Sequence, residues 1–204
     1  MARAFSYIVK RDFGFAPNPF YGFLTLATCK QRIRKAAGVG DFIIGNSTVA
    51  YGNKLIYMAK VSKVITFDEY WNDPQYEMKK PVMNGSQKKL FGDNIYHHDA
   101  NGNWIQEDSH HTNDDGTVNE YNLNRDTGTT DRVLICDEFI YLGKSMIDVP
   151  SVYESCIHHG INHHCPDIAI AQDLWAYLQE RYPDSGKIDL PNQFNHFERY
   201  NGVS

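Results

Sequence analysis

No stretch of the sequence approaches the ~18 apolar residues that a membrane-spanning helix requires, so we expect no membrane span. The residues before Lys10 and Arg11 include no apolar segment of the kind that directs secretion. Cysteine is scarce as well, because four cysteines in 204 residues do not form the dense pattern of a small disulfide-stabilised domain. Together these absences predict a protein of a reduced, cytoplasmic setting.

Several motifs of nucleotide-handling enzymes and hydrolases are also missing. The chain has no Gly-x-x-x-x-Gly-Lys-Ser/Thr phosphate loop, and Gly38-x-Gly40 precedes a strand rather than a helix, which excludes a dinucleotide-binding turn. The zinc-binding pattern of base deaminases is absent. No Gly-x-Ser-x-Gly turn surrounds Ser109, so a serine hydrolase is not supported.

Aromatic side chains, in contrast, are plentiful, with 3 Trp, 13 Tyr and 11 Phe. This content argues against disorder, and the absence of a repeat or a clear linker predicts a single domain over residues 1–204. The net charge of −5 is unevenly distributed, since ten of the 20 Lys and Arg but only two of the 25 acidic residues precede residue 66. Such a basic region would suit one anionic group, such as a nucleotide phosphate, unless the two halves of the chain interleave and their charges mix. The acidity of the whole argues against non-specific DNA binding.

Hydrophobic periodicity and capping residues predict strands and helices in an irregular order. Strands are expected at residues 4–10, 42–46, 55–65, 132–136 and 139–142. Helices are expected at residues 28–37 with Thr28 as N-cap, after the Thr66–Glu69 capping box, near Ser151 and along an amphipathic stripe at 167–182. The order lacks the regular alternation of a doubly wound sheet. It predicts an α+β fold, either a compact mixed sheet or a small barrel flanked by helices, with a C-terminal helical segment at about 151–183.

A long polar insertion at about residues 90–131 is the unusual feature of the chain. Loops of this length inside a compact domain are usually functional or disordered. The spaced aromatic residues Tyr96, Trp104 and Tyr121 argue against disorder. We therefore expect a folded loop that contacts a ligand.

Two groups in the chain offer acid–base or nucleophilic chemistry. His110 lies beside Asp108, and an imidazole near a carboxylate can transfer protons close to neutral pH. His110 could act in this way as a catalytic residue, or it could only donate a hydrogen bond to a ligand. Cys29, next to Lys30, could carry a lowered thiol pKa, although a small buried thiol is the commoner interpretation.

Metal binding is a further hypothesis, because histidines and cysteines are concentrated near the C-terminal segment. Cys156, His158, His163 and Cys165 lie within ten residues and offer enough ligands for a zinc site. The spacing lacks paired Cys-x-x-Cys ligands, so a polar turn that is rich in histidine is the simpler explanation of the cluster. The metal-stabilised structural protein is therefore one alternative for the function, and the sequence assigns no cofactor.

Motifs along most of the chain resemble one known family. One of them is Asp-x-Gly-Phe-Ala-Pro-Asn-Pro-Phe at residues 12–20, and the others are at 25–34, 40–45, 55–61, 67–71, 92–96, 106–110 and 131–135. From about Ser6 to Pro150 the chain is similar to the second of the nucleotide modification associated domain families. This resemblance implies a role in the alteration of bases in DNA, in bacteria and phages. The Gly-Asp-aromatic strand also resembles barrels of the pseudouridine-synthase-and-archaeosine-transglycosylase (PUA) type, an analogy of fold alone.

A base handled outside its helix needs aromatic faces for stacking and polar groups for its edges. The insertion offers both kinds at Asp93, Asn94, Tyr96, Trp104, Gln106, Ser109, Asn119 and Asp126. A phosphate would be held by the basic residues Lys30, Arg32 and Arg34. The alternatives are that the aromatic residues anchor the loop in the core and that the basic trio is a solvated helix face. We expect binding of a nucleotide or modified base, free or within DNA, with catalysis by His110 and Asp108 as the second hypothesis.

Overall fold

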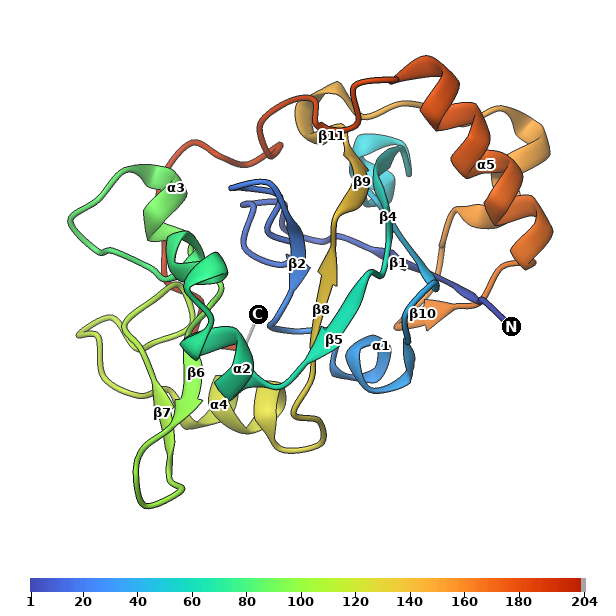
Figure 1. Cartoon of the computed structure of the whole chain (residues 1–204). Helices are drawn as coiled ribbons and strands as arrows, with labels where there is room; N and C mark the ends of the chain where they lie inside the picture. Colours follow the sequence, from blue (N-terminus) through green and yellow to red (C-terminus); the bar gives the residue numbers. More distant parts are fainter. Residues whose placement is uncertain (203–204) are drawn as a thin grey trace.

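The computed structural model describes residues 1–202 and places six strands in one mixed sheet (Figure 1). Across the sheet the strands are β10 (His163–His164), β1 (Ala4–Ile8), β3 (Phe42–Asn46), β4 (Leu55–Lys60), β9 (Glu138–Tyr141) and β11 (Gly186–Lys187). The pairs β1/β3 and β9/β11 are parallel and the other pairs are antiparallel. The predicted strands at residues 4–10, 42–46 and 139–142 are thereby confirmed with small changes at their ends.

Two further sheets are smaller. One consists of β2 (Leu24–Leu26), β8 (Val133–Cys136) and β5 (Lys63–Ile65), and the other is the hairpin of β6 (Tyr96–His98) and β7 (Trp104–Gln106). The prediction of one continuous strand at 55–65 is wrong. The chain leaves the large sheet after Lys60, and Ser62 then donates its amide hydrogen to the carbonyl of Ile135, which places β5 on β8. The mixed-sheet α+β prediction is confirmed, and the strands of residues 1–202 do not close into a barrel.

The predicted caps of two helices are confirmed, whereas Thr28 and Ser151 do not cap the helices expected there and the helices at Gln87–Leu90 and Glu120–Thr127 were not predicted. They are α1 (Gln31–Ala36), α2 (Phe67–Asn72), α3 (Gln87–Leu90), α4 (Glu120–Thr127) and α5 (Ile168–Arg181), with 3₁₀ turns at Val49–Tyr51, Pro74–Lys79, Gly143–Ser145 and Ser151–Cys156. Thr66 and Glu69 form the predicted capping box, and Asp167 caps α5. Thr28 does not cap α1, because the two residues after it form a left-handed turn and Lys30 becomes the N-cap. None of the helices in the described part of the chain is both long and apolar enough to cross a membrane.

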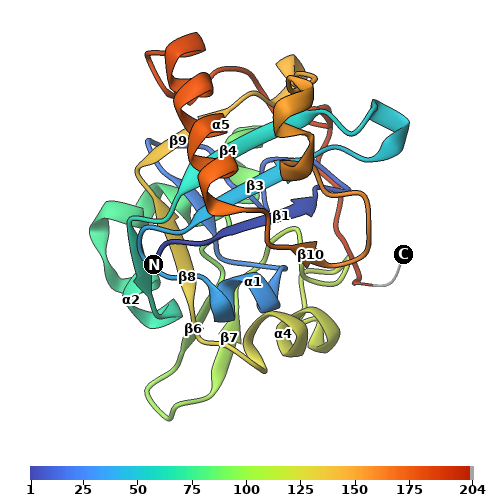
Figure 2. The same cartoon turned by 90° about the vertical axis from the view of Figure 1, so that its right-hand side faces the viewer.

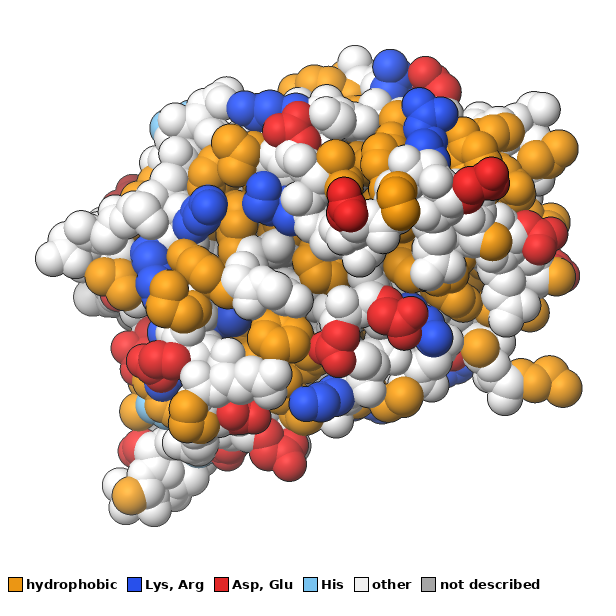
Figure 3. Space-filling model, turned by 45° about the horizontal axis from the view of Figure 1, so that its top comes forward, with side chains coloured by type: hydrophobic (Ala, Val, Ile, Leu, Met, Phe, Trp, Pro, Cys, Tyr) orange, Lys and Arg blue, Asp and Glu red, His pale blue; other side chains and the backbone are white. Residues whose placement is uncertain are grey.

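The hydrophobic core lies on both faces of the large sheet. Helix α5 covers one face, where Leu174 and Leu178 pack with Met58 and Ile140 (Figure 2). The other face packs against α1 and the second sheet. On the face drawn in Figure 3, acidic and basic side chains interleave, as expected if the basic and acidic halves of the chain mix in space.

The polar insertion is folded, as predicted. It contributes β6, β7 and α4, which lie beside α2 and the second sheet in Figure 1. Tyr96 is fully buried in an aromatic-rich part of the hydrophobic core, together with Phe13, Phe67 and Phe91. Because α4 contacts α1, the insertion brings its side chains to the turn that precedes α1.

Candidate functional site

A strained turn joins β2 to α1. Cys29 and Lys30 both have positive φ angles, 53° and 37°, a left-handed conformation that residues with a Cβ rarely adopt. The backbone amide of Cys29 donates a hydrogen bond to Asp126 Oδ1 of α4 at 2.9 Å. Such strain persists only where the surroundings hold it, and here the insertion supplies the partner.

Three side chains from separate segments form a chain of contacts at this turn. Cys29 Sγ lies 3.7 Å from His111 Nε2, and His111 Nδ1 lies 2.9 Å from Asp126 Oδ2. His111 and Asp126 are buried, whereas Cys29 is partly exposed. The order thiol, imidazole, carboxylate is the arrangement in which an imidazole can take a proton from a nucleophile while the carboxylate fixes its orientation.

The positive charge of His111 stabilises the negative charges of both Cys29 and Asp126, although the Asp126 carboxylate itself opposes a thiolate. Burial alone would raise the pKa of the Cys29 thiol, but the neighbouring His111 imidazolium and Arg125 guanidinium lower that pKa below its ordinary value. Burial opposes the charge of His111, but Cys29 and Asp126 raise the pKa of its imidazole. Burial likewise opposes the charge of Asp126, and the charges of His111 and Arg125 hold the pKa of this carboxyl well below its usual range. The site therefore favours a thiolate beside an imidazolium.

Many of the residues expected to bind a ligand instead support this chain of contacts. Tyr96 donates its hydroxyl to Asp126 at 3.0 Å. Gln106 donates to the Tyr96 hydroxyl and to the carbonyl of His111, and its oxygen accepts from the amide of Asn119. The Asn119 side chain caps α4, the helix that carries Asp126.

Arg34 has the same supporting role. Its side chain is fully buried, and it donates to the backbone carbonyls of Cys29 at 2.9 Å, of Arg132 at 2.8 Å and of Asp126. Because these donors are engaged within the protein, Arg34 is not placed to hold a phosphate. Its hydrogen bonds connect the turn at Cys29 to helix α4.

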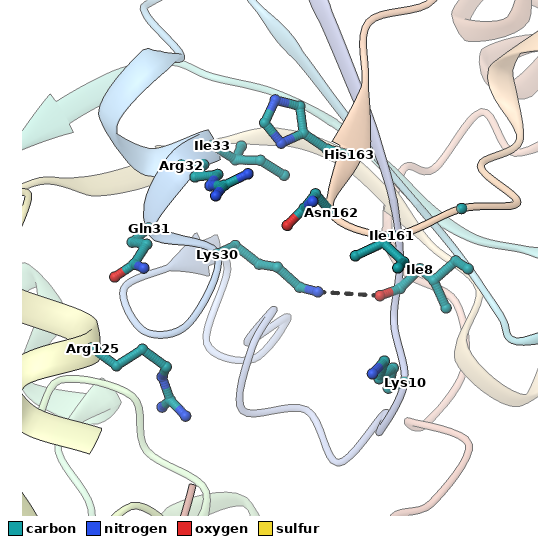
Figure 4. A pocket seen from close by; sticks show the side chains of 11 residues that line it. Ile8, Lys10, Lys30, Gln31, Arg32, Ile33, Arg125, Ile161, Asn162 and His163 are labelled. Carbon is teal, nitrogen blue, oxygen red and sulfur yellow. Dashed lines mark hydrogen bonds between the residues drawn. The ribbon is translucent and has the colours of Figure 1, made fainter. Parts of the chain in front are cut away.

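Two cavities that share lining residues lie at this turn, and Cys29 lines the smaller of them. The smaller, of about 200 Å³, is lined by Val9, Lys10, Arg11, Phe13, Phe15, Ala16, Cys29, Lys30, His110, His111, Arg125 and Tyr200. The larger, of about 340 Å³, is lined by Ile8, Lys10, Lys30, Gln31, Arg32, Ile33, Arg125, Gly160, Ile161, Asn162 and His163 (Figure 4). Lys10, Lys30 and Arg125 line both. Within residues 1–202, no aspartate or glutamate lines either cavity.

The expected catalytic residues His110 and Asp108 each contact other groups, and no hydrogen bond joins them in the described part of the chain. The Asp108 carboxylate is bound by Arg199 and by the Thr112 hydroxyl. The His110 ring packs among the rings of Phe13, Phe15 and Phe91, and its Nδ1 contacts the carbonyl of Glu198. Burial and the charge of His111 lower the pKa of His110 to about 3, so its imidazole is neutral near pH 7.

The remaining predicted ligand residues lie away from both cavities. Asp93 is buried and accepts hydrogen bonds from the hydroxyls of Thr25 and Tyr70, while the Asn94 amide donates to the Tyr70 carbonyl. The Ser109 hydroxyl accepts a hydrogen bond from the amide of His111.

Trp104 also lies away from the cavities. It is half-buried and packs edge-to-face against Phe67, with ring centroids 5.6 Å apart, and next to His98. In the structure, Trp104 therefore anchors the β6–β7 hairpin.

The predicted metal ligands near the C-terminus do not converge. In the part of the chain that the structure describes, one group of three potential ligands comes together, and it consists of Cys29, His111 and Asp126. His158 instead contacts His164, and His163 lines the larger cavity.

Sequence reasoning missed His111 and gave Cys29 the interpretation of a buried thiol. It also missed Lys10, Arg11 and Arg125, which join Lys30 and Arg32 only in the folded chain. The one available signal was the doublet of His110 and His111 within a polar insertion, and the prediction named only His110.

A comparison with known families gives one match. A model of the family described as nucleotide modification associated domain 2 matches residues 1–198. The match includes every residue that lines the two cavities except Tyr200. Among curated proteins and among solved structures, no match was found.

Proposed function

This chain belongs to the nucleotide modification associated domain 2 family, and from that membership we propose that it binds a nucleotide or a modified base in the two adjoining cavities. The observation that carries the proposal is the charge of the lining. Lys10, Arg11, Lys30, Arg32 and Arg125 border the cavities, and no acidic side chain of residues 1–202 does. A cleft of one sign of charge concentrates ligands of the opposite sign.

The larger cavity suits the phosphate. Lys10 follows β1, Lys30 and Arg32 begin α1, and Arg125 comes from α4, so cations approach it from three directions (Figure 4). Lys30 is held across the cavity by a 3.2 Å hydrogen bond from Nζ to the carbonyl of Ile8. A phosphate replacing this neutral carbonyl would gain a charge-assisted hydrogen bond.

The smaller cavity suits the flat heterocycle. Phe13, Phe15 and Tyr200 supply ring surfaces beside Cys29. The Tyr200 ring is itself held by two cations, Arg11 at 4.7 Å and Arg125 at 5.7 Å from its centroid. Stacking on an aromatic side chain stabilises a bound base by about 1–3 kcal/mol. Aromatic surface next to a cationic cavity is the pairing that a nucleotide requires.

Calorimetric titration with the four deoxynucleosides and their 5′-monophosphates tests this proposal. If the larger cavity holds the phosphate, at least one monophosphate binds roughly tenfold more tightly than its nucleoside, since charge-assisted hydrogen bonds contribute about 1.5–3 kcal/mol each. Added salt should weaken the binding of the monophosphate and leave the binding of the nucleoside largely unchanged. Equal affinities for the two forms, or no binding of any of the eight compounds, would refute the proposal.

A further inference from the structure

We propose that Cys29, His111 and Asp126 form a nucleophilic centre that transfers an acyl group of a phosphate-bearing substrate through a thioester on Cys29. The phosphate part of this inference rests on the proposed function, because the larger cavity would hold that group. The acyl carbon would lie in the smaller cavity, which Cys29 and His111 both line.

The geometry assigns each residue a separate task. Cys29 is a partly exposed residue at a left-handed turn, and it lines the smaller cavity. His111 presents Nε2 to the thiol and Nδ1 to the carboxylate of Asp126, which fixes the tautomer and the ring. Asp126 acts through His111 and does not reach a substrate, because it is fully buried. It is therefore a positioning residue.

These three side chains suit proton transfer better than they suit the binding of a metal ion. The two oxygens of Asp126 already accept hydrogen bonds from the amide of Cys29, the hydroxyl of Tyr96, His111 and Arg125. A carboxylate offers about four such sites, so none is left for a cation. Arg125 Nη2 also lies 3.3 Å from both ring nitrogens of His111, and its positive charge opposes a second cation there.

Acyl transfer fits the arrangement better than addition of the thiol to a base. In acyl transfer the leaving group departs from the same carbon that sulfur attacks, and His111 Nε2 lies beside Sγ, where it can protonate that group. Addition to a ring carbon would need an acid placed one or two bonds further along the ring, whereas His111 Nε2 lies directly beside Sγ.

The steps balance without an oxidant or a reductant. The Cys29 thiol proton passes to His111 Nε2, and the thiolate attacks the acyl carbon, forming a C–S bond. The bond from that carbon to the leaving oxygen or nitrogen breaks, and the leaving group takes the proton from Nε2. Water or an amine then attacks the thioester while His111 accepts its proton, which returns to sulfur as the C–S bond breaks.

Alkylation by iodoacetamide at pH 6 provides the first test, with the labelled peptide identified by mass spectrometry and N-acetylcysteine as the reference thiol. Each unit by which a thiol pKa is lowered raises the thiolate fraction about tenfold and reduces thiolate nucleophilicity about threefold. Cys29 should therefore react faster than the reference thiol in the wild-type protein, by about threefold for each unit by which its thiol pKa is lowered. It should lose this advantage in His111→Gln, while Cys165→Ser, at an exposed cysteine outside both cavities, leaves it unchanged.

Acylation by p-nitrophenyl acetate provides the second test. Its first readout uses the wild-type protein alone, so it does not depend on the folding of a variant. The wild-type protein should release one equivalent of p-nitrophenolate in a burst, with acetyl on Cys29 that hydroxylamine removes. General acid–base catalysis contributes roughly 10²–10⁴-fold, so His111→Gln should lose at least a hundredfold of this rate. Acetylation of Cys165 alone, or a Cys29 rate equal to that of N-acetylcysteine in both tests, would overturn the proposal, as would stoichiometric zinc in the purified protein.

Protection by a nucleotide separates this inference from the proposed function. If both hold, a bound deoxynucleoside 5′-monophosphate slows the alkylation of Cys29. If alkylation depends on His111 but no monophosphate protects, the nucleophilic centre stands and the nucleotide site fails. If a monophosphate protects a thiol whose reactivity does not depend on His111, the nucleotide site stands and the nucleophilic centre fails.

Discussion

Replacing Arg32 by glutamine removes one positive charge from the rim of the larger cavity and leaves the fold unchanged. Arg32 is exposed on α1, and its guanidinium makes no hydrogen bond or ion pair with the described residues. Lys35 provides a matched control because it is also exposed, lies on the same helix and carries the same charge, but does not line either cavity. Any difference between Arg32→Gln and Lys35→Gln therefore reports the position of the charge.

The size of the effect follows from the exposure of Arg32. Two unit charges 4 Å apart interact by about 1 kcal/mol in water and by about 4 kcal/mol in a medium of effective dielectric constant 20. Because Arg32 is exposed, its interaction with a phosphate should be close to the lower of these energies, about 1 kcal/mol. Loss of about 1 kcal/mol corresponds to a fivefold increase in Kd. Lys35→Gln acts on the ligand only through screened, longer-range attraction and should change Kd less than twofold.

Calorimetry at low and moderate salt, with the nucleoside 5′-monophosphate that binds best, measures both variants. The fivefold loss for Arg32→Gln should shrink as salt is added, because an exposed charge is screened. Equal losses in the two variants would mean that the ligand responds to net charge alone. An unchanged affinity in Arg32→Gln would contradict the assignment of the larger cavity as the phosphate site.

Three further predictions concern stability. Trp104→Ala should lower the free energy of unfolding by about 2 kcal/mol, because half-buried packing on Phe67 is lost, and should leave nucleotide affinity unchanged. Arg34→Met should cost at least about 3 kcal/mol in urea unfolding, since buried carbonyls lose their donors, and should slow alkylation of Cys29. Burial raises the pKa of Asp12 from 3.8 to about 6, so the folded state binds a proton that the unfolded state releases between these values. The stability that this group contributes is present below pH 4 and is lost as the pH rises through 6. The free energy of unfolding falls by about 3 kcal/mol over this range. Urea unfolding of Asp12→Asn at several pH values should show no such loss.

The longer strands and the helices with clear local signals were predictable, whereas α3, α4 and the short strands β2, β6, β7, β10 and β11 were not predicted. The Thr66–Glu69 capping box and the apolar stripe of α5 depend on residues a turn apart, and both are confirmed. The break after Lys60 was not predictable, because residues 55–65 alternate like one strand and only pairing with β8 divides them.

The site was less predictable, because its residues meet only through tertiary contacts. His110 and His111 are equivalent in sequence, but the aromatic cluster surrounds one and Asp126 of α4 faces the other. The ionisation of Cys29 likewise depends on His111 and Arg125, which are distant in the chain. Ligand binding by the amides and carboxylates of the insertion stays a prediction, and in the structure Gln106 bonds to the His111 carbonyl and the Asn119 amide.

A crystal structure with the best-binding deoxynucleoside 5′-monophosphate tests the central claim most directly. The phosphate should lie within hydrogen-bond distance of Lys30 or Arg32 in the larger cavity, and the base should lie against Phe15 or Tyr200 in the smaller one, next to Cys29. A nucleotide bound elsewhere on the protein, with its phosphate on other cations, would contradict the account.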